Sequence, residues 1–138
     1  MTTPFVDVLM ACVEHVNTQL GPYLREVAYR RAMVACLRSY KYNVLEEVTV
    51  PVMYEDPQHV LVKVQDIIMD IVVVDPDGNF THVLELKHKD TTPSSVKEAC
   101  DQLQGYKDVL AKQGQTIEEC WVLFFQKKAD SQPKLIQV

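Results

Sequence analysis

The sequence predicts an α/β protein, and three features of its residue pattern carry that prediction. Apolar residues recur at helical spacing through residues 2–40 and again through residues 91–114. Between these patterns, residues 44–87 are rich in β-branched residues, and the turn signal "DPDGN" divides them. A short, fully apolar run, "CWVLFFQ", follows the last helical pattern and is typical of a central strand. We therefore expect the element order α-α-β-β-β-α-β.

The composition is typical of a globular protein with a single domain over residues 1–138. The 138 residues suffice for one hydrophobic core, and 47% of them are hydrophobic while 24% are charged. No apolar run is long enough to span a membrane, and the N-terminus lacks the pattern of a secretion signal. The four cysteines form no Cys-x-x-Cys pair, which suits buried thiols in a reducing compartment. We expect an intracellular protein, cytoplasmic or nuclear, without a membrane partner.

Residues 2–40 predict two helices that follow each other directly. Thr3 is suited to cap the first helix, Pro4 fits its first turn, and Gly21 marks its end. The second helix begins near Pro22. The apolar stripe of the first helix comprises Val6, Leu9, Met10, Val13, Val16 and Leu20. The second helix has an apolar side with Leu24, Val27, Ala28 and Ala35, and a basic side with Arg25, Arg30, Arg31 and Arg38.

Residues 44–87 predict a three-stranded antiparallel meander. The first strand covers residues 44–54, where Pro51 indicates an edge strand or a bulge. Residues 60–74 form one long strand or two short ones. The third strand follows the "DPDGN" turn directly.

The C-terminal part predicts a helix, a buried strand and a tail. In residues 91–114, Ser95 and Glu98 have the spacing of a capping box, and Gly114 ends the helix. Its buried stripe comprises Val96, Ala99, Leu103, Tyr106 and Leu110. After the apolar strand, residues 127–138 form a polar, peripheral tail in which a short edge strand is offered by Leu135, Ile136 and Val138.

Asp70 interrupts the apolar run "IIMDIVVV". A buried carboxylate without a partner destabilises a fold, so Asp70 needs a hydrogen-bonding partner, a metal ion or an opening to water. The alternative interpretation is an aspartate at a strand end, or one that accepts hydrogen bonds from the backbone. Taken alone, Asp70 fits that alternative better.

Glu85 and Lys87 lie two residues apart in the strand "HVLELKHKD". Side chains at this spacing project from one face of a strand, and Leu84 and Leu86 project from the other. A lone Glu-x-Lys strand is usually a solvated surface. The turn after residue 74, however, joins the strand of Asp70 to this one, so the carboxylates of Asp70 and Glu85 come side by side. Two carboxylates suit Mg²⁺ or Mn²⁺, and Lys87 would then orient a water or stabilise phosphate charge.

This constellation resembles the PD-(D/E)xK nuclease superfamily, in which an acidic residue on one strand and a (D/E)-x-K on the next bind a metal ion. The resemblance implies a restriction-endonuclease-like, three-layer fold whose mixed central sheet is flanked by helices. It also implies that Asp70, Glu85 and the backbone carbonyl of Leu86 hold the metal, and that Lys87 positions water or the phosphate. Met69 stands where the motif's name has proline, which members of the family commonly lack.

Two further segments resemble the same superfamily. "LGPYLREVAY" is similar to the signature of the small GxxExxY proteins, whose conserved positions fall on Gly21, Glu26 and Tyr29. The resemblance assigns Glu26 to the metal or water shell. "ACDQLQGYKDVL" resembles the glutamine-containing helix of the family, with Gln102 facing the site and Tyr106 one turn on.

The supporting candidates each have an ordinary structural alternative. The candidate substrate-binding residues are Arg30, Arg31, Tyr29, Tyr106 and Lys89. The tyrosines fit core or rim aromatics better than catalytic groups, and the arginines would also serve only to solubilise their helix. Taken alone, Glu26 is best explained as an acidic residue of the first helical turn, where the helix dipole favours negative charge. Gln102 alone reads as a solvated helix residue.

The resemblance implies a Mg²⁺- or Mn²⁺-dependent nuclease that hydrolyses phosphodiester bonds in DNA and acts as a homodimer. The matched motifs put its core at about residues 21–126. The net charge of −5 argues against charge-driven coating of long nucleic acids, although local patches matter more than the total. Two alternatives stay open. One is a catalytically idle interaction module with the nuclease fold, and the other is a metal-dependent enzyme acting on RNA or small nucleotides.

Overall fold

The computed structural model describes residues 3–138, and its elements follow the predicted order with one strand added at the end. The tail supplies that strand, so the short edge strand offered by residues 127–138 is confirmed. The order is therefore α-α-β-β-β-α-β-β. The elements are α1 Phe5–Leu20, α2 Glu26–Ser39, β1 Asn43–Glu55, β2 Leu61–Val74, β3 Phe80–His88, α3 Pro93–Lys112, β4 Glu119–Phe125 and β5 Lys134–Gln137.

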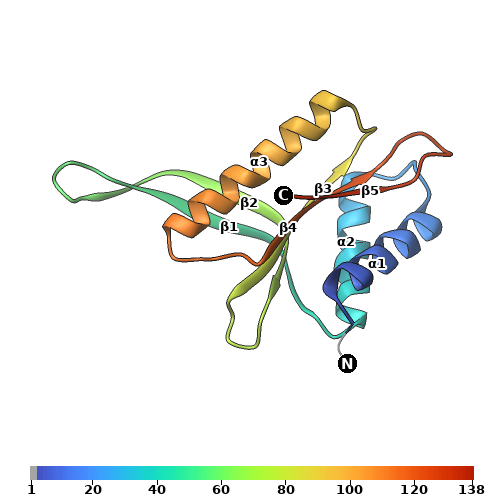
Figure 1. Cartoon of the computed structure of the whole chain (residues 1–138), viewed down its shortest axis with the longest axis horizontal. Coiled ribbons are helices and arrows are strands. Elements are labelled where there is room, and N and C mark those ends of the chain that lie inside the picture. The colour runs from blue at the N-terminus through green and yellow to red at the C-terminus, as the bar shows by residue number, and fades with distance from the viewer. Residues whose placement is uncertain (1–2) are drawn as a thin grey trace.

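The five strands form one mixed sheet in the order β1-β2-β3-β4-β5. Strands β1, β2 and β3 form the predicted antiparallel meander, and β2 is one continuous strand. Strand β4 runs parallel to β3, because α3 returns the chain to the same end of the sheet, and β5 pairs antiparallel with β4. Helices α1 and α2 lie together on one face of the sheet and α3 lies on the other (Figure 1). The predicted three-layer, restriction-endonuclease-like architecture is confirmed.

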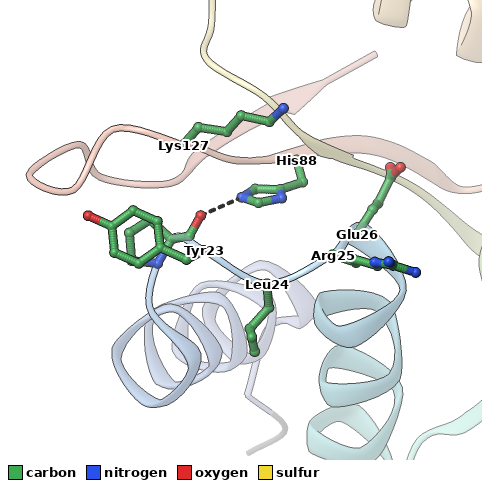
Figure 2. Close-up of a pocket in the computed structure, with 7 residues that line it drawn as sticks. Tyr23, Leu24, Arg25, Glu26, His88 and Lys127 are labelled. Atoms are coloured by element: carbon green, nitrogen blue, oxygen red, sulfur yellow. Dashed lines mark hydrogen bonds between the residues drawn. The ribbon is translucent and has the colours of Figure 1, made fainter.

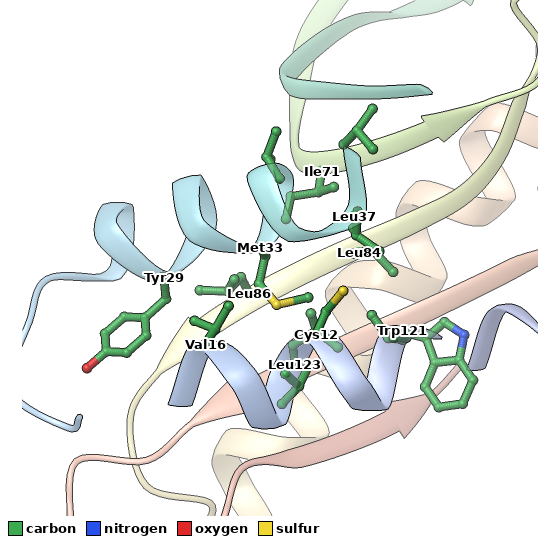
Figure 3. Close-up of a cluster of buried hydrophobic side chains, with 14 of the residues drawn as sticks. Cys12, Val16, Tyr29, Met33, Leu37, Ile71, Leu84, Leu86, Trp121 and Leu123 are labelled. Carbon is green, nitrogen blue, oxygen red and sulfur yellow. The ribbon is translucent and has the colours of Figure 1, made fainter. Parts of the chain in front are cut away.

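An apolar core fills each of the two spaces between sheet and helices. The core between the sheet and the α1–α2 pair includes Cys12, Val16, Tyr29, Met33, Leu37, Ile71, Leu84, Leu86, Trp121 and Leu123 (Figure 3). The core beneath α3 includes Met69, Val72, Val83, Ala99, Leu103, Leu110, Cys120, Val122 and Phe124. Strands β3 and β4 contribute to both cores, so they are held on both faces. The rigid centre of the sheet is therefore β3 and β4.

The ribbon formed by β1 and β2 turns over at Glu47 and Asp70, so that the strand face directed at the α1–α2 pair before this point is directed away from it afterwards. Alternate residues of a regular strand share a face, yet Ile71 packs in the α1–α2 core and Met69 packs beneath α3. The register of paired residues skips Glu47 and Asp70 at this point. Glu47 has a φ of 53°, in the left-handed region that few residues other than glycine adopt. Such irregularities re-aim side chains, and here the residue at the turnover is Asp70.

Beyond the turnover, β1 and β2 continue as a two-stranded arm, residues 49–68, that extends past the end of α3 (Figure 1). The register between β1 and β2 shifts again between Val52 and Met53, next to Pro51, where a bulge was one of the two predicted outcomes. One face of the arm packs toward α3 through Val50 and Ile67. The other face is apolar and exposed, and it carries Tyr54, Val62, Val64 and Ile68.

The helix starts differ from the predicted ones. Helix α1 has Pro4 at its N-cap without any side-chain cap, so the expected cap by Thr3 is wrong. Helix α2 begins at Glu26, four residues after Pro22, because residues 22–24 form bends that are tied to other parts of the fold. The cap of α3 is Thr92, whose side chain accepts from the Ser95 backbone while the Ser95 hydroxyl accepts from the Thr92 backbone. The expected Ser95–Glu98 box is therefore wrong by three residues.

Parts of the predicted helical stripes are also wrong. Met10 is exposed, and Val8 and Cys12 face the core in α1. Leu24 lies before α2 and is exposed, and Ala35 within α2 is exposed as well. The buried positions of α2 are Tyr29, Met33, Val34 and Leu37. Both helices pack against each other as well as the sheet, so their buried faces are rotated from the stripe that the sequence favoured. The predicted stripe of α3 is confirmed, because α3 packs on the sheet alone. No helix within residues 3–138 has the length and apolar character needed to cross a bilayer.

The two candidate caps of α3 can be separated by mutation. Thr92→Ala removes the hydroxyl that accepts from the Ser95 N–H, and we expect it to lower the free energy of unfolding by about 1 kcal/mol. Glu98→Ala is the matched control, because Glu98 is an exposed residue outside the cap, and it should change stability by less than about 0.5 kcal/mol. Urea denaturation of both variants measures this. Equal effects of the two substitutions would contradict the cap.

Candidate active site

The candidate site lies where β2 separates from β3. The two strands are paired from Phe80 to Leu84, which is opposite Ile71, and the next residues along are Asp70 on β2 and Glu85 on β3. At this fork, side-chain carboxylates accept hydrogen bonds from backbone N–H groups that the backbone pairing of β2 and β3 no longer satisfies. The Asp70 backbone N–H donates to Glu85 Oε1 at 3.3 Å, and the Leu86 backbone N–H donates to Asp70 Oδ2 at 2.9 Å. The structure therefore brings the Asp70 and Glu85 carboxyl groups together, each fixed by the backbone of the other's strand.

Burial makes this pair electrostatically costly. Glu85 is only 3% exposed. Burial, followed by the neighbouring charge of Asp70, raises the pKa of Glu85 to about 8, and the Asp70 N–H and Lys87 oppose the shift only in part. At neutral pH the pair therefore holds a proton when no cation neutralises it. Two adjoining carboxyl groups whose negative charges are unfavourable in this buried place form a site suited to a cation.

Glu26 approaches the pair from the first turn of α2. Burial raises the pKa of Glu26, the charge of Asp70 raises it further, and Lys87, Arg30 and His88 lower it. Glu26 is thus within electrostatic reach of Asp70 and Lys87. Across residues 3–138, however, no group of three or more histidine, cysteine, aspartate or glutamate side chains lies close enough to hold a metal ion together. Glu26 is accordingly near the carboxylate pair without joining it as a third direct ligand.

Lys87, Gln102 and Tyr106 form a hydrogen-bonded row between β3 and α3. The Lys87 ammonium donates to Gln102 Oε1 at 3.3 Å, and Gln102 Nε2 donates to the Tyr106 hydroxyl at 2.8 Å. Burial raises the pKa of the Tyr106 hydroxyl, and the charge of Glu85 adds to the effect. The row orients Lys87 on the strand face that it shares with Glu85, as the Glu-x-Lys spacing predicted.

The Gly21, Glu26 and Tyr29 signature acts by shaping the loop before α2. Gly21 has a φ of 69°, in the left-handed region. The Tyr29 hydroxyl donates to the Gly21 carbonyl and accepts from the Leu24 N–H at 3.3 Å. The Tyr29 ring is fully buried and stacks on Phe125, with ring centroids 4.9 Å apart. Tyr29 therefore fixes the loop that delivers Glu26, and its core alternative fits better than contact with a substrate.

His88 ties the same loop to the strand that carries the site, a role that was not predicted from the sequence. His88 Nε2 lies 2.8 Å from the Pro22 carbonyl oxygen and its ring lies 4.6 Å from the ring of Tyr29. From the sequence, His88 merely extended a charged strand end. Only its position next to Lys87 hinted at a role near the site.

A pocket of about 470 Å³ opens beside Glu26 (Figure 2). Its walls are the loop before α2, which supplies Tyr23, Leu24 and Arg25, together with His88 from β3 and Lys127 from the segment after β4. Figure 2 shows the His88–Pro22 hydrogen bond at the base of the loop, and Lys127 across from Tyr23. None of Tyr23, Arg25 and Lys127 was a predicted site residue.

The predicted basic residues differ in their ion pairing and in their exposure to solvent. Arg30 is ion-paired with Glu46 at 2.7 Å and Glu47 at 3.1 Å, so its charge is largely neutralised by β1. Arg31 is exposed on α2, and Lys89 is half-buried beyond the end of β3. Of the three, Arg30 is within electrostatic reach of Asp70 and Glu26.

The pKa of Glu85 predicts how the stability of the metal-free protein depends on pH. In the unfolded chain Glu85 loses its proton near the ordinary value of 4.5, and in the folded chain it keeps the proton until about 8. Between these values the folded state binds more protons, so the free energy of unfolding should fall as pH rises, by at most about 1.4 kcal/mol per pH unit. Glu26, whose pKa is also raised, acts in the same direction.

Denaturation between pH 5 and pH 8 in the presence of a chelator measures this slope. Glu85→Gln should flatten it, whereas Glu14→Gln, on the exposed face of α1, should leave it unchanged. A slope of opposite sign, or one of unchanged size in Glu85→Gln, would contradict the burial of a shared proton at the fork.

Comparison with known proteins agrees with the fold and the motifs. No curated protein matches the chain. The family model of the PD-(D/E)XK nuclease superfamily matches residues 4–131, which is nearly the whole sequence and includes every motif at the fork. The chain therefore belongs to the PD-(D/E)XK nuclease superfamily.

Proposed function

We propose that the chain is a nuclease that hydrolyses phosphodiester bonds in DNA with the help of Mg²⁺ or Mn²⁺. The observation that carries the proposal is the fork, where Asp70 and Glu85 from neighbouring strands lie side by side and Lys87 follows on the same strand face. Membership of the nuclease superfamily supports the same chemistry. We also propose that the protein is intracellular, because its four cysteines are free thiols, as is usual in a reducing compartment.

The donor set at the fork fits a hard divalent cation. Oxygen ligands are those that Mg²⁺ and Mn²⁺ prefer, and Mg²⁺ commonly binds through one or two carboxylates while keeping several waters. Asp70 and Glu85 would hold the ion with the Leu86 carbonyl, and its charge would replace the proton that burial now imposes on the pair. Once bound, the ion lowers the pKa of a bound water and neutralises charge on a phosphate. Glu26, just outside the pair, is suited to hold a water of the ion's shell.

The remaining chemistry belongs to the row from β3 to α3. Lys87 presents a cation beside the pair, and a phosphate held there would be stabilised as negative charge develops on its oxygens. Gln102 accepts one of the ammonium hydrogen bonds of Lys87 and is itself bound to Tyr106. Gln102 and Tyr106 are accordingly positioning residues, because they restrict where the ammonium group points.

Cleavage of a labelled oligonucleotide tests the proposal. The wild-type protein should cleave with Mg²⁺ or Mn²⁺ and not with a chelator, and Lys87→Ala should lower kcat by about a hundredfold or more through loss of the cation. Lys97→Ala is the matched control, because Lys97 is an exposed lysine of α3 paired only with Asp101, and it should keep full activity. Unchanged cleavage by a folded Lys87→Ala variant would overturn the assignment.

The idle interaction module remains the second candidate function. It is favoured by one observation, that no third histidine, cysteine, aspartate or glutamate joins the carboxylate pair at ligand distance in residues 3–138. Metal binding at the fork without any cleavage of DNA, RNA or a small nucleotide phosphodiester would support it. Cleavage of RNA or of a small nucleotide in place of DNA would instead support an enzyme whose substrate differs from the one proposed.

We propose that the homodimer forms through the arm. Val62, Val64 and Ile68 alternate with Ile67, which packs toward α3, so they project together from the opposite face. Strand β1 is also an edge of the sheet, and β2 has no second neighbour along the arm, so both edges of the ribbon are open. A second copy with its own apolar arm matches such a face better than a charged partner does.

Sedimentation velocity tests the dimer. The wild-type protein should sediment as a dimer, and the double variant Val64→Lys with Ile68→Lys as a monomer, because paired arms would bury like charges. Met10→Lys is the control, since Met10 is an exposed apolar residue on α1, remote from the arm. A monomeric wild-type protein, or a double variant that stays dimeric, would contradict the arm as the interface.

A further inference from the structure

The pocket beside Glu26 holds an aromatic side chain that is exposed although its loop is firmly fixed. Tyr23 is 81% exposed. The backbone on either side of it is held by the His88–Pro22 contact and by the Tyr29 hydroxyl, which binds both the Gly21 carbonyl and the Leu24 N–H. The loop is thus ordered by its own hydrogen bonds, without burying the ring. An exposed aromatic ring on a fixed loop offers a flat stacking surface.

Two cations line the same pocket and have no carboxylate partner. Arg25 and Lys127 line the pocket, and neither has an ion pair within 4.0 Å anywhere in residues 3–138. Arg30, one turn along α2, contrasts with them, because Glu46 and Glu47 already neutralise it. The two cations therefore supply positive charge at the pocket of an otherwise acidic protein.

The backbone at Lys127 is fixed as well. Asp90 Oδ1 accepts from the backbone N–H of Lys127 at 2.9 Å and from that of Lys128 at 3.2 Å. Asp90 follows β3, so the segment after β4 is anchored to the end of the strand that carries Glu85 and Lys87. The backbone of Lys127 is thereby held in place relative to the strand that carries the fork.

The pocket is linked to the carboxylate pair through two of its wall residues. Glu26 lines the pocket and at the same time feels the charges of Asp70 and Lys87. His88, another wall residue, directly follows Lys87. A nucleic-acid strand with one phosphate at the fork would therefore direct a neighbouring nucleotide into the pocket.

We propose that this pocket binds one unpaired nucleotide of the substrate, with its base stacked on Tyr23 and its phosphate at Arg25 and Lys127, and that the substrate is single-stranded nucleic acid. In a duplex the faces of a base are covered by its neighbours, whereas an unpaired base is free to stack on a protein ring. Stacking and phosphate contacts do not depend on the sugar, so DNA and RNA strands are both candidates. The proposal rests on the proposed function, since it names the substrate class of the same site.

Fluorescence anisotropy without metal tests the pocket while no cleavage occurs. The probes are a labelled oligothymidine, a labelled oligouridine of the same length and a labelled blunt DNA duplex. Tyr23→Ala should weaken binding of the single strands about tenfold, because one base loses its stacking partner. Tyr23→Phe keeps the ring and should bind like the wild type. Tyr40→Ala, which removes an exposed tyrosine at the end of α2, should have no effect.

The salt dependence tests the cations separately. Lys127→Ala should reduce the slope of log affinity against log salt by about 0.7 for the single strands, as expected for the loss of one phosphate contact. Tyr23→Ala should leave that slope unchanged, because stacking releases no counterion. A folded state for each variant is checked by its thermal melt.

Several results would overturn the inference. They are undetectable binding of both single strands, an equal loss of duplex and single-strand binding in Tyr23→Ala, or wild-type affinity in Tyr23→Ala. These outcomes are separate from the fate of the proposed chemistry. Metal-dependent cleavage that needs Lys87 but not Tyr23 would reject the nucleotide-binding role of the pocket and support the nuclease activity. Tyr23-dependent binding without cleavage would support the role of the pocket and reject the nuclease activity.

Discussion

The reciprocal hydrogen bonding between Asp70 and the Glu85–Leu86 segment is the constraint on which the site depends. Each strand supplies a backbone N–H to the carboxylate of the other at the point where their ladder ends. These bonds hold two carboxyl groups together that would otherwise repel each other, and burial of Glu85 raises the energy of the charged pair further. The fold therefore keeps an unfavourable pair of acids in place, and a cation would relieve that cost.

The rest of the molecule can be understood as support for this fork. Strand β3 lies between two apolar cores, so Leu84 and Leu86 fix the position of Glu85 between them. The turnover at Glu47 sends the outer part of β2 away from β3, which leaves Asp70 at the junction. On the other side, Tyr29 and His88 tie the loop that precedes Glu26 to the same strand. Three separate parts of the chain thus meet at one end of β3.

Much of this arrangement could be predicted from the sequence, because it depends on local patterns. The "DPDGN" turn fixes which strands are neighbours, and strand periodicity fixes that Glu85 and Lys87 share a face. The pairing of Asp70 with Glu85 follows from these two facts. Gln102 was found through a motif, and the structure then gave it a partner in Lys87.

The features that the sequence did not reveal depend on packing between distant segments. Nothing in the local pattern around Glu47 indicates that the ribbon turns over there, since a left-handed φ at a glutamate has no sequence signal. The start of α2 at Glu26 depends on His88, which is 62 residues further along the chain and 66 from its partner Pro22. The helix stripes shifted because α1 and α2 bury part of their surface against each other. Such contacts become visible only when the elements are assembled.

If Asp70 and Glu85 together form a cation site, calorimetric titration with Mn²⁺ should detect it. We expect one binding site per chain in the wild-type protein, and loss of that site in Asp70→Asn. Asp66→Asn, which changes an exposed carboxylate of the same strand, should bind Mn²⁺ as the wild type does. Absence of Mn²⁺ binding in the wild-type protein, or equal binding by Asp70→Asn, would show that the two carboxylates do not form a cation site.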